Sequence, residues 1–109
     1  MNLVNITPHD IVVRKADGDL MVPPSGQIAR VTTSQEVIGY IDDVPVVRTV
    51  FGEVTGLPDP VKDTIFIVSS LVLGALKGSR PDVVAPDTGP TAIRNDNGQI
   101  VAVTRFQMI

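Results

Sequence analysis

Few side chains in this sequence suit acid–base or nucleophilic chemistry. His9 is the only histidine of the 109 residues, and it stands next to Asp10. An imidazole oriented by a carboxylate could act as the general base for a serine nucleophile. No serine, however, lies in the Gly-x-Ser-x-Gly pattern of a nucleophile elbow, and His9 equally suits a turn in which its ring bonds to nearby backbone. We therefore expect no catalytic residues and predict that the chain is not an enzyme.

Metal ligands are equally scarce. The chain has no cysteine, which excludes a zinc ribbon, a thiol enzyme and a disulfide framework. Aspartates occur in pairs within turn-like segments, where they are favoured for bonding their own backbone: Asp17/Asp19, Asp42/Asp43 and Asp59/Asp63. Residues 95–98 have the types found in a calcium loop but lack the glutamate that completes one. We expect neither a metal site nor a cofactor.

A glycine-rich segment, Gly74–Ser79, contains the residue types of a phosphate-binding loop. Its lysine precedes the second glycine, and the segment lies at the expected end of a helix rather than at its start. The helix dipole disfavours an anion at that end. The match is therefore spurious.

The most unusual stretch is Arg80–Arg94, which contains the tripeptide Asp87-Thr88-Gly89. This tripeptide occurs in aspartic proteases, where two copies must meet. Here Pro86 interrupts the hydrophobic strand that such a site needs, so protease activity is not expected.

Two interpretations of this stretch remain open. In the first, the hydroxyls of Thr88 and Thr91 and the N–H of Gly89 donate to a ligand, while Arg80 or Arg94 binds its phosphate. In the second, the stretch is a rigid loop in which Asp87 closes an Asx turn and Arg94 lies on a solvated hairpin.

Composition excludes several classes of partner. The formal charge is −3 and the nine basic residues are scattered, so the basic stripe of a duplex-DNA-binding protein is missing. The longest apolar run, residues 65–76, is shorter than the roughly 20 residues of a membrane-spanning helix. The first residues lack the features of a signal peptide. We expect a cytoplasmic protein that binds neither duplex nucleic acid nor a membrane.

The elements that must position these residues are short. Apolar and polar residues alternate over 27–33, which predicts a strand. Residues 36–41 and 44–51 flank Asp42-Asp43 and are predicted as two strands joined by a hairpin turn. The continuous apolar run at 64–68 predicts a strand buried on both faces. Ser69 is a suitable N-cap for a helix over residues 70–77, and Asn97-Gly98 predicts a type I′ hairpin turn. The whole pattern predicts one domain, residues 1–109, that is mainly β: a small β-barrel or sandwich of about eight short strands with one short helix.

The chain also resembles a family of small proteins found in actinobacterial and tailed-phage genomes. The resemblance spans nearly its full length and rests on these segments: Asn5–His9, Pro23–Gly26, Ile65–Ser69, Asp87–Arg94 and Gly98–Val103. It implies a genomic setting rather than a mechanism. Small non-enzymatic phage proteins often act by binding, and one class consists of oligomeric sponges that capture nucleotide signals of bacterial antiviral defence.

That setting leads to two hypotheses. The first is a sponge that sequesters a small anionic nucleotide in the host cytosol, in a pocket formed by the following residues: Arg80, Asp87, Thr88, Gly89, Thr91 and Arg94, closed by Thr7 and His9. The second is a structural or interaction module, such as a virion accessory subunit or an inhibitor of a host protein. We also expect a homo-oligomer, because a domain of this size buries only about 65% of its unfolded surface.

Overall fold

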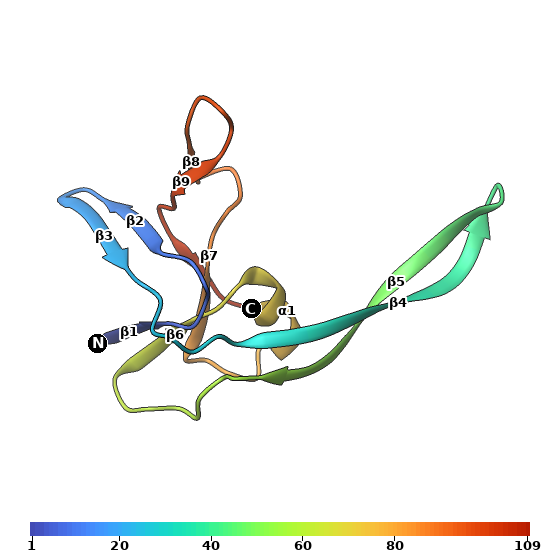
Figure 1. The fold of residues 1–109 in the computed structure, drawn as a ribbon, viewed down its shortest axis with the longest axis horizontal. Coiled ribbons are helices and arrows are strands. Elements are labelled where there is room, and N and C mark those ends of the chain that lie inside the picture. The colour runs from blue at the N-terminus through green and yellow to red at the C-terminus, as the bar shows by residue number, and fades with distance from the viewer.

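A computed structural model describes all 109 residues, and a four-stranded sheet lies at its centre (Figure 1). The strand order is β1-β6-β7-β10, with β1, β6 and β7 parallel and β10 antiparallel to β7. The bounds are Asn2–Asn5 for β1, Thr64–Ile67 for β6, Val83–Pro86 for β7 and Phe106–Gln107 for β10. The carboxyl ends of the three parallel strands therefore meet at one edge.

Strand β6 is buried on both faces, as its continuous apolar sequence predicted. Phe66 faces the larger core cluster, together with residues of the helix and of the turn after β1. Its neighbour Ile67 is fully buried on the opposite face with Val22 and Val84. Because successive side chains of a strand alternate between faces, this one strand contributes to both clusters.

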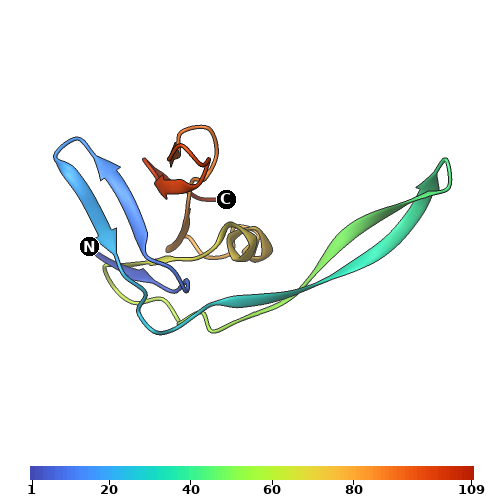
Figure 2. The same ribbon diagram turned by 45° about the horizontal axis from the view of Figure 1, so that its top comes forward.

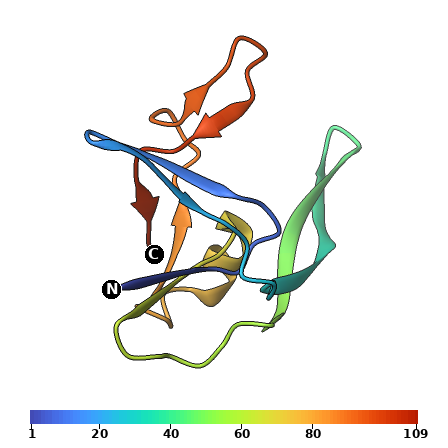
Figure 3. The same ribbon diagram turned by 60° about the vertical axis from the view of Figure 1, so that its left-hand side comes forward.

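The remaining strands form three hairpins. Their bounds are Ile11–Lys15 and Gly18–Val22 for β2 and β3, Arg30–Ile41 and Val44–Thr55 for β4 and β5, and Ile93–Arg94 and Ile100–Ala102 for β8 and β9. Each pair forms a separate two-stranded sheet, and the hairpins extend in different directions from the core (Figure 3). The prediction of a mainly β fold is confirmed, with ten strands instead of eight.

The prediction of a small β-barrel is wrong, because no closed barrel is present and the strands form several small sheets. Three central strands are parallel, and parallel neighbours need crossover connections rather than the tight turns from which a small up-and-down barrel is built. The hairpins therefore remain outside the central sheet instead of extending it.

Helix α1, Ser70–Leu76, agrees closely with the predicted 70–77. The Ser69 hydroxyl oxygen accepts the Val72 N–H at 3.2 Å, as expected of an N-cap. At the other end Lys77 is left-handed and its N–H bonds to the Gly74 carbonyl. The helix covers one face of the sheet through Val72 and Leu73.

The longest element is the β4–β5 hairpin, which we call the arm. Its two 12-residue strands extend well beyond the rest of the chain (Figures 1 and 2). The two strands predicted at 27–33 and 36–41 are one continuous strand with bulges after Val31 and after Val37. Asp42 and Asp43 both have positive φ, 48° and 64°, which is the geometry of a type I′ turn.

The turn near Asn97 differs from its prediction. Only Gly98 has positive φ, so the turn is not type I′. The Asn95 side-chain oxygen instead accepts the N–H groups of Asn97 and Gln99, both at 3.0 Å. This local side-chain bonding stabilises a longer loop. No helix of the structure has the length and apolar character needed to cross a membrane.

Candidate functional site

A pocket of about 340 Å³ lies where the carboxyl ends of β1, β6 and β7 meet. Ligands of sheets with parallel strands commonly bind at this edge. The pocket is lined mainly by the segments that follow the three strands, together with the end of β7 and the start of β2. The lining residues are Thr7, Pro8, His9, Ile11, Val68, Ser69, Ser70, Pro86 and Thr88. Three residues of the predicted site, Thr7, His9 and Thr88, are thus brought together from segments about 80 residues apart in sequence.

Asn5 holds the turn that carries Thr7 and His9. Its side-chain amide donates to the carbonyl oxygens of His9 at 2.7 Å and Val22 at 2.9 Å. Its side-chain oxygen accepts both the N–H and the hydroxyl of Thr7, at 2.9 and 2.7 Å. Asn5 is 1% exposed; its bonds to Val22 and Thr7 are buried, and its bond to His9 is partly buried. They position the first wall of the pocket against the β2–β3 hairpin.

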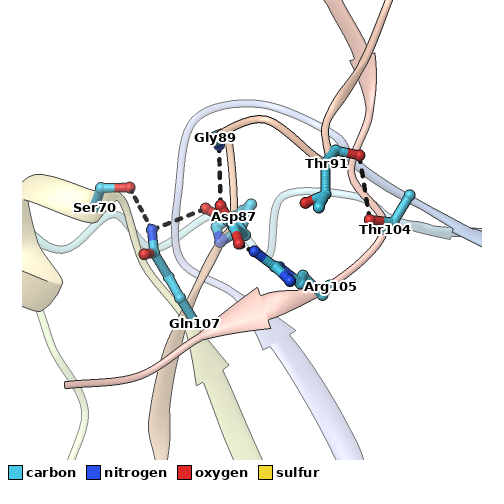
Figure 4. Close-up of polar contacts among 8 residues, drawn as sticks. Ser70, Asp87, Gly89, Thr91, Thr104, Arg105 and Gln107 are labelled. Carbon is cyan, nitrogen blue, oxygen red and sulfur yellow. Dashed lines mark hydrogen bonds and ion pairs between the residues drawn. The ribbon is translucent and has the colours of Figure 1, made fainter.

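The second wall is tied to the C-terminal strand. The side-chain amide of Gln107 donates to the Ser70 hydroxyl at 3.1 Å and to the Pro86 carbonyl at 3.3 Å (Figure 4). One side chain of β10 therefore connects the start of α1 to the end of β7. Sequence reasoning missed Ser70, Pro86 and Gln107 because Gln107 is 37 residues from Ser70, and no local pattern reports such a contact.

Asp87 organises the loop that carries Thr88. One carboxylate oxygen accepts the Gly89 N–H at 2.9 Å, and the other accepts from the guanidinium of Arg105 (Figure 4). The Asp87 N–H also donates to the Arg105 carbonyl at 3.0 Å. The Gly89 N–H and, secondly, the Arg105 guanidinium hold the pKa of Asp87 below its ordinary value. The loop is thus an Asx turn clamped from the C-terminal segment.

We expect Asp87 to make part of the stability depend on pH. Its pKa is lowered in the folded chain, so the ionised carboxylate stabilises the fold above the ordinary value of about 3.9. This contribution is lost as pH falls through the folded-state pKa. Urea unfolding measures the free energy of unfolding of wild type and of Asp87→Asn. The difference between the two free energies should be constant above about pH 5 and shrink below about pH 4. A difference in unfolding free energy that does not change as the pH falls below about 4 would contradict this prediction.

The two arginines of the predicted site do not line the pocket. Arg80 lies before β7, where it forms a two-bond ion pair with Asp82 at 2.9 and 2.8 Å and donates to the Pro58 carbonyl at 2.8 Å. Arg94 is exposed on the β8–β9 hairpin and donates to the Gly98 carbonyl at 2.7 Å. Both guanidinium groups thus have partners within the chain.

Thr91 lies farther along the Asp87 loop. Its carbonyl accepts from the Thr104 hydroxyl at 3.2 Å (Figure 4), while its own buried hydroxyl oxygen has no hydrogen-bond partner. Arg105 is the cation that the structure brings to this loop instead, and it is mostly exposed. Its partner lies 18 residues away in sequence, so spacing alone does not identify it.

A second, open hollow of about 620 Å³ lies at the base of the arm beside α1. Its apolar lining comes from Ala29 and Val31 on the arm side and from Leu71 and Val72 on the helix, with Arg30 and Glu53 also contributing. No sequence feature identified it, because it forms between two separate elements.

The carboxyl-edge pocket combines apolar walls with a few polar groups, the usual composition of a small-molecule site. The proline rings offer apolar contacts, the hydroxyls of Ser70 and Thr88 offer hydrogen bonds, and the imidazole of His9 offers a further hydrogen-bonding group. These groups suit a ring-containing polar ligand. Comparisons with protein-family models, curated proteins and solved structures found no match to this chain.

Proposed function

We propose that the chain is a non-enzymatic binding protein that sequesters a small anionic nucleotide in the carboxyl-edge pocket. One observation carries the proposal: three segments, each following a parallel strand, converge on one pocket with hydroxyls, one imidazole and apolar walls. In this arrangement the ligand is held in the pocket and no bond is broken.

Each group has a distinct part in the proposed complex. The base packs against Pro8 and Pro86, because apolar surfaces favour a flat ring. The hydroxyls of Ser70 and Thr88 bond to ribose or base. The imidazole N–H of His9 donates a hydrogen bond to a phosphate, while Arg105 beside the loop is already paired with Asp87. Arg80 and Arg94 have no part, since their partners lie within the chain.

The resemblance to phage and actinobacterial proteins points to the class of ligand. We infer that it is a nucleotide signal of bacterial antiviral defence, bound in the host cytosol. The net charge of −3 slows the encounter with an anion, so tight binding must come from slow dissociation.

Isothermal titration calorimetry against cyclic mononucleotides, cyclic dinucleotides and ADP-ribose derivatives tests the proposal. At least one compound should give a saturable heat, and His9→Ala or Thr88→Ala should weaken its binding about 10-fold, the equivalent of one lost hydrogen bond of about 1.4 kcal/mol. Arg94→Ala is the matched control and should leave the affinity unchanged. No heat from any compound in the panel would reject the nucleotide proposal.

A second candidate function is that of a structural or interaction module, as in a virion accessory subunit or an inhibitor of a host protein. The observation that favours it is the arm, which extends away from the core and carries exposed apolar residues (Figure 1). Mass spectrometry of purified virions distinguishes the two functions, because a cytosolic sponge should not copurify with particles in fixed stoichiometry.

A further inference from the structure

The arm exposes apolar side chains along most of its outer half. Those more than a third exposed are Val37, Ile38, Tyr40, Ile41, Val44, Val47, Val50 and Phe51. Adjacent residues such as Tyr40 and Ile41, which lie in a regular part of the strand, point to opposite faces, so exposed apolar side chains occur on both faces of the ribbon. An isolated two-stranded hairpin is marginally stable in water. The arm therefore needs a partner surface.

The accessible surface area of the chain indicates how much of the arm a partner would cover. The accessible surface is 7236 Å², whereas a compact monomer of this mass exposes about 5,800 Å². The excess, about 1,400 Å², exceeds the roughly 800 Å² that each partner buries in a standard interface. The radius of gyration is 16.3 Å, against about 13 Å for a compact chain of this length. Covering the arm by association would remove the excess.

The two ends of the arm are chemically complementary. The outer end carries Ile41 and Val44 around the acidic turn Asp42-Asp43, and the nearest basic residue in sequence, Arg48, is paired with Glu36. The base carries the 620 Å³ hollow, lined in part by Val31 and Leu71. At the rim of this hollow is Arg30, an exposed arginine with no ion pair within the chain. The apolar residues of the tip therefore suit the apolar lining of the hollow, and the acidic turn suits Arg30 at its rim; Glu53 also lines the hollow.

Tip and base of one chain cannot meet, because a 12-residue strand separates them by about 36 Å. We propose that two copies of this chain associate through their arms, aligned antiparallel about a two-fold axis. The tip of each arm fills the hollow at the base of the other, and Asp42 and Asp43 approach the partner's Arg30. A two-fold axis repeats the contact between tip and hollow, so that both tips and both hollows of the dimer are occupied.

The mass of the protein in solution is the first test. Sedimentation equilibrium at micromolar concentrations should give twice the mass of one chain. The double variant Ile41→Asp/Val44→Asp should reduce this to one chain mass while circular dichroism stays unchanged, because the tip lies outside the core. Met21→Asp is the matched control: Met21 is 60% exposed on β3, and its replacement should leave the dimer intact. A monomeric wild type would overturn the proposal.

Disulfide cross-linking tests the antiparallel alignment. Because the chain has no native cysteine, only the introduced cysteines can form a disulfide. The double variant Ile41→Cys/Leu71→Cys should form a disulfide-linked dimer under oxidation. Each single variant should remain largely unlinked, because the two tips lie at opposite ends of the dimer. A dimer that links through Ile41→Cys alone, or not at all in the double variant, would overturn this geometry.

A charge exchange tests the polar contact. Arg30→Glu should weaken the dimer at least 10-fold, and adding Asp42→Lys and Asp43→Lys in the same chain should restore it. Failure of the triple variant to recover would contradict the pairing of tip and base. The arm proposal is independent of the nucleotide proposal, since the carboxyl-edge pocket shares only Ser69 with the hollow.

Discussion

Replacing Asn5 by alanine should lower the free energy of unfolding by about 3 kcal/mol or more. The change removes all four bonds of a side chain that is 1% exposed. It leaves the carbonyls of His9 and Val22 without this donor and the N–H of Thr7 without this acceptor. Each buried polar group that loses its partner costs about 1–3 kcal/mol, so the effect exceeds that of the lost side-chain volume.

Urea unfolding followed by circular dichroism measures this loss. Asn2→Ala is the matched control, because Asn2 is an exposed asparagine in the same strand. Its effect should stay within about 0.5 kcal/mol. Asn5→Asp separates the two halves of the network: it keeps the acceptor for Thr7 but loses both donors, and should also destabilise strongly. An effect of Asn5→Ala no larger than that of Asn2→Ala would contradict the role of Asn5.

Replacing Phe66 by alanine should cost about 3–5 kcal/mol. Phe66 is 3% exposed at the centre of the sheet, where β6 pairs with both β1 and β7. Its ring belongs to the larger core cluster with the helix residues Val72 and Leu73, so its removal leaves a cavity between sheet and helix. Only 18 of the 109 residues are buried, and we expect little stability in reserve.

The measurement is the midpoint of urea unfolding at one fixed protein concentration. Phe66→Leu is the control that keeps most of the volume, and should cost clearly less than Phe66→Ala, because a smaller cavity remains. Equal and small losses of stability in both variants would mean that Phe66→Ala leaves no larger cavity than Phe66→Leu. That result would contradict the packing of Phe66 between the sheet and α1.

Local features were predicted well wherever a few neighbouring residues decide the conformation. The Ser69 cap, the helix after it and the turn at Asp42-Asp43 all depend on contacts within a few residues. The buried strand at Thr64–Ile67 followed from its unbroken apolar run. The turn at Asn97 failed for a related reason: the Asn95 side chain competes for the same backbone N–H groups, which dipeptide preference ignores.

The candidate site was only partly accessible from sequence. Thr7, His9 and Thr88 were selected for their chemistry, and the structure places all three at one pocket. Arg80 and Arg94 were selected because they flank the Asp87 loop. They bond elsewhere, because proximity in sequence does not determine which way a guanidinium points. Gln107 and Arg105 could not be chosen, since their partners become neighbours only when β10 pairs with β7.

The sequence by itself determined that this protein is a mainly β chain with one short helix, without cysteine chemistry and without a basic stripe. These properties follow from composition and from interactions between neighbouring residues. Only the tertiary structure decided that the sheet is parallel at its centre, that its carboxyl edge forms a pocket, and that the arm lies outside the core. Strand pairing joins segments tens of residues apart, and the free energy of that pairing depends on the burial of whole surfaces rather than on local preference.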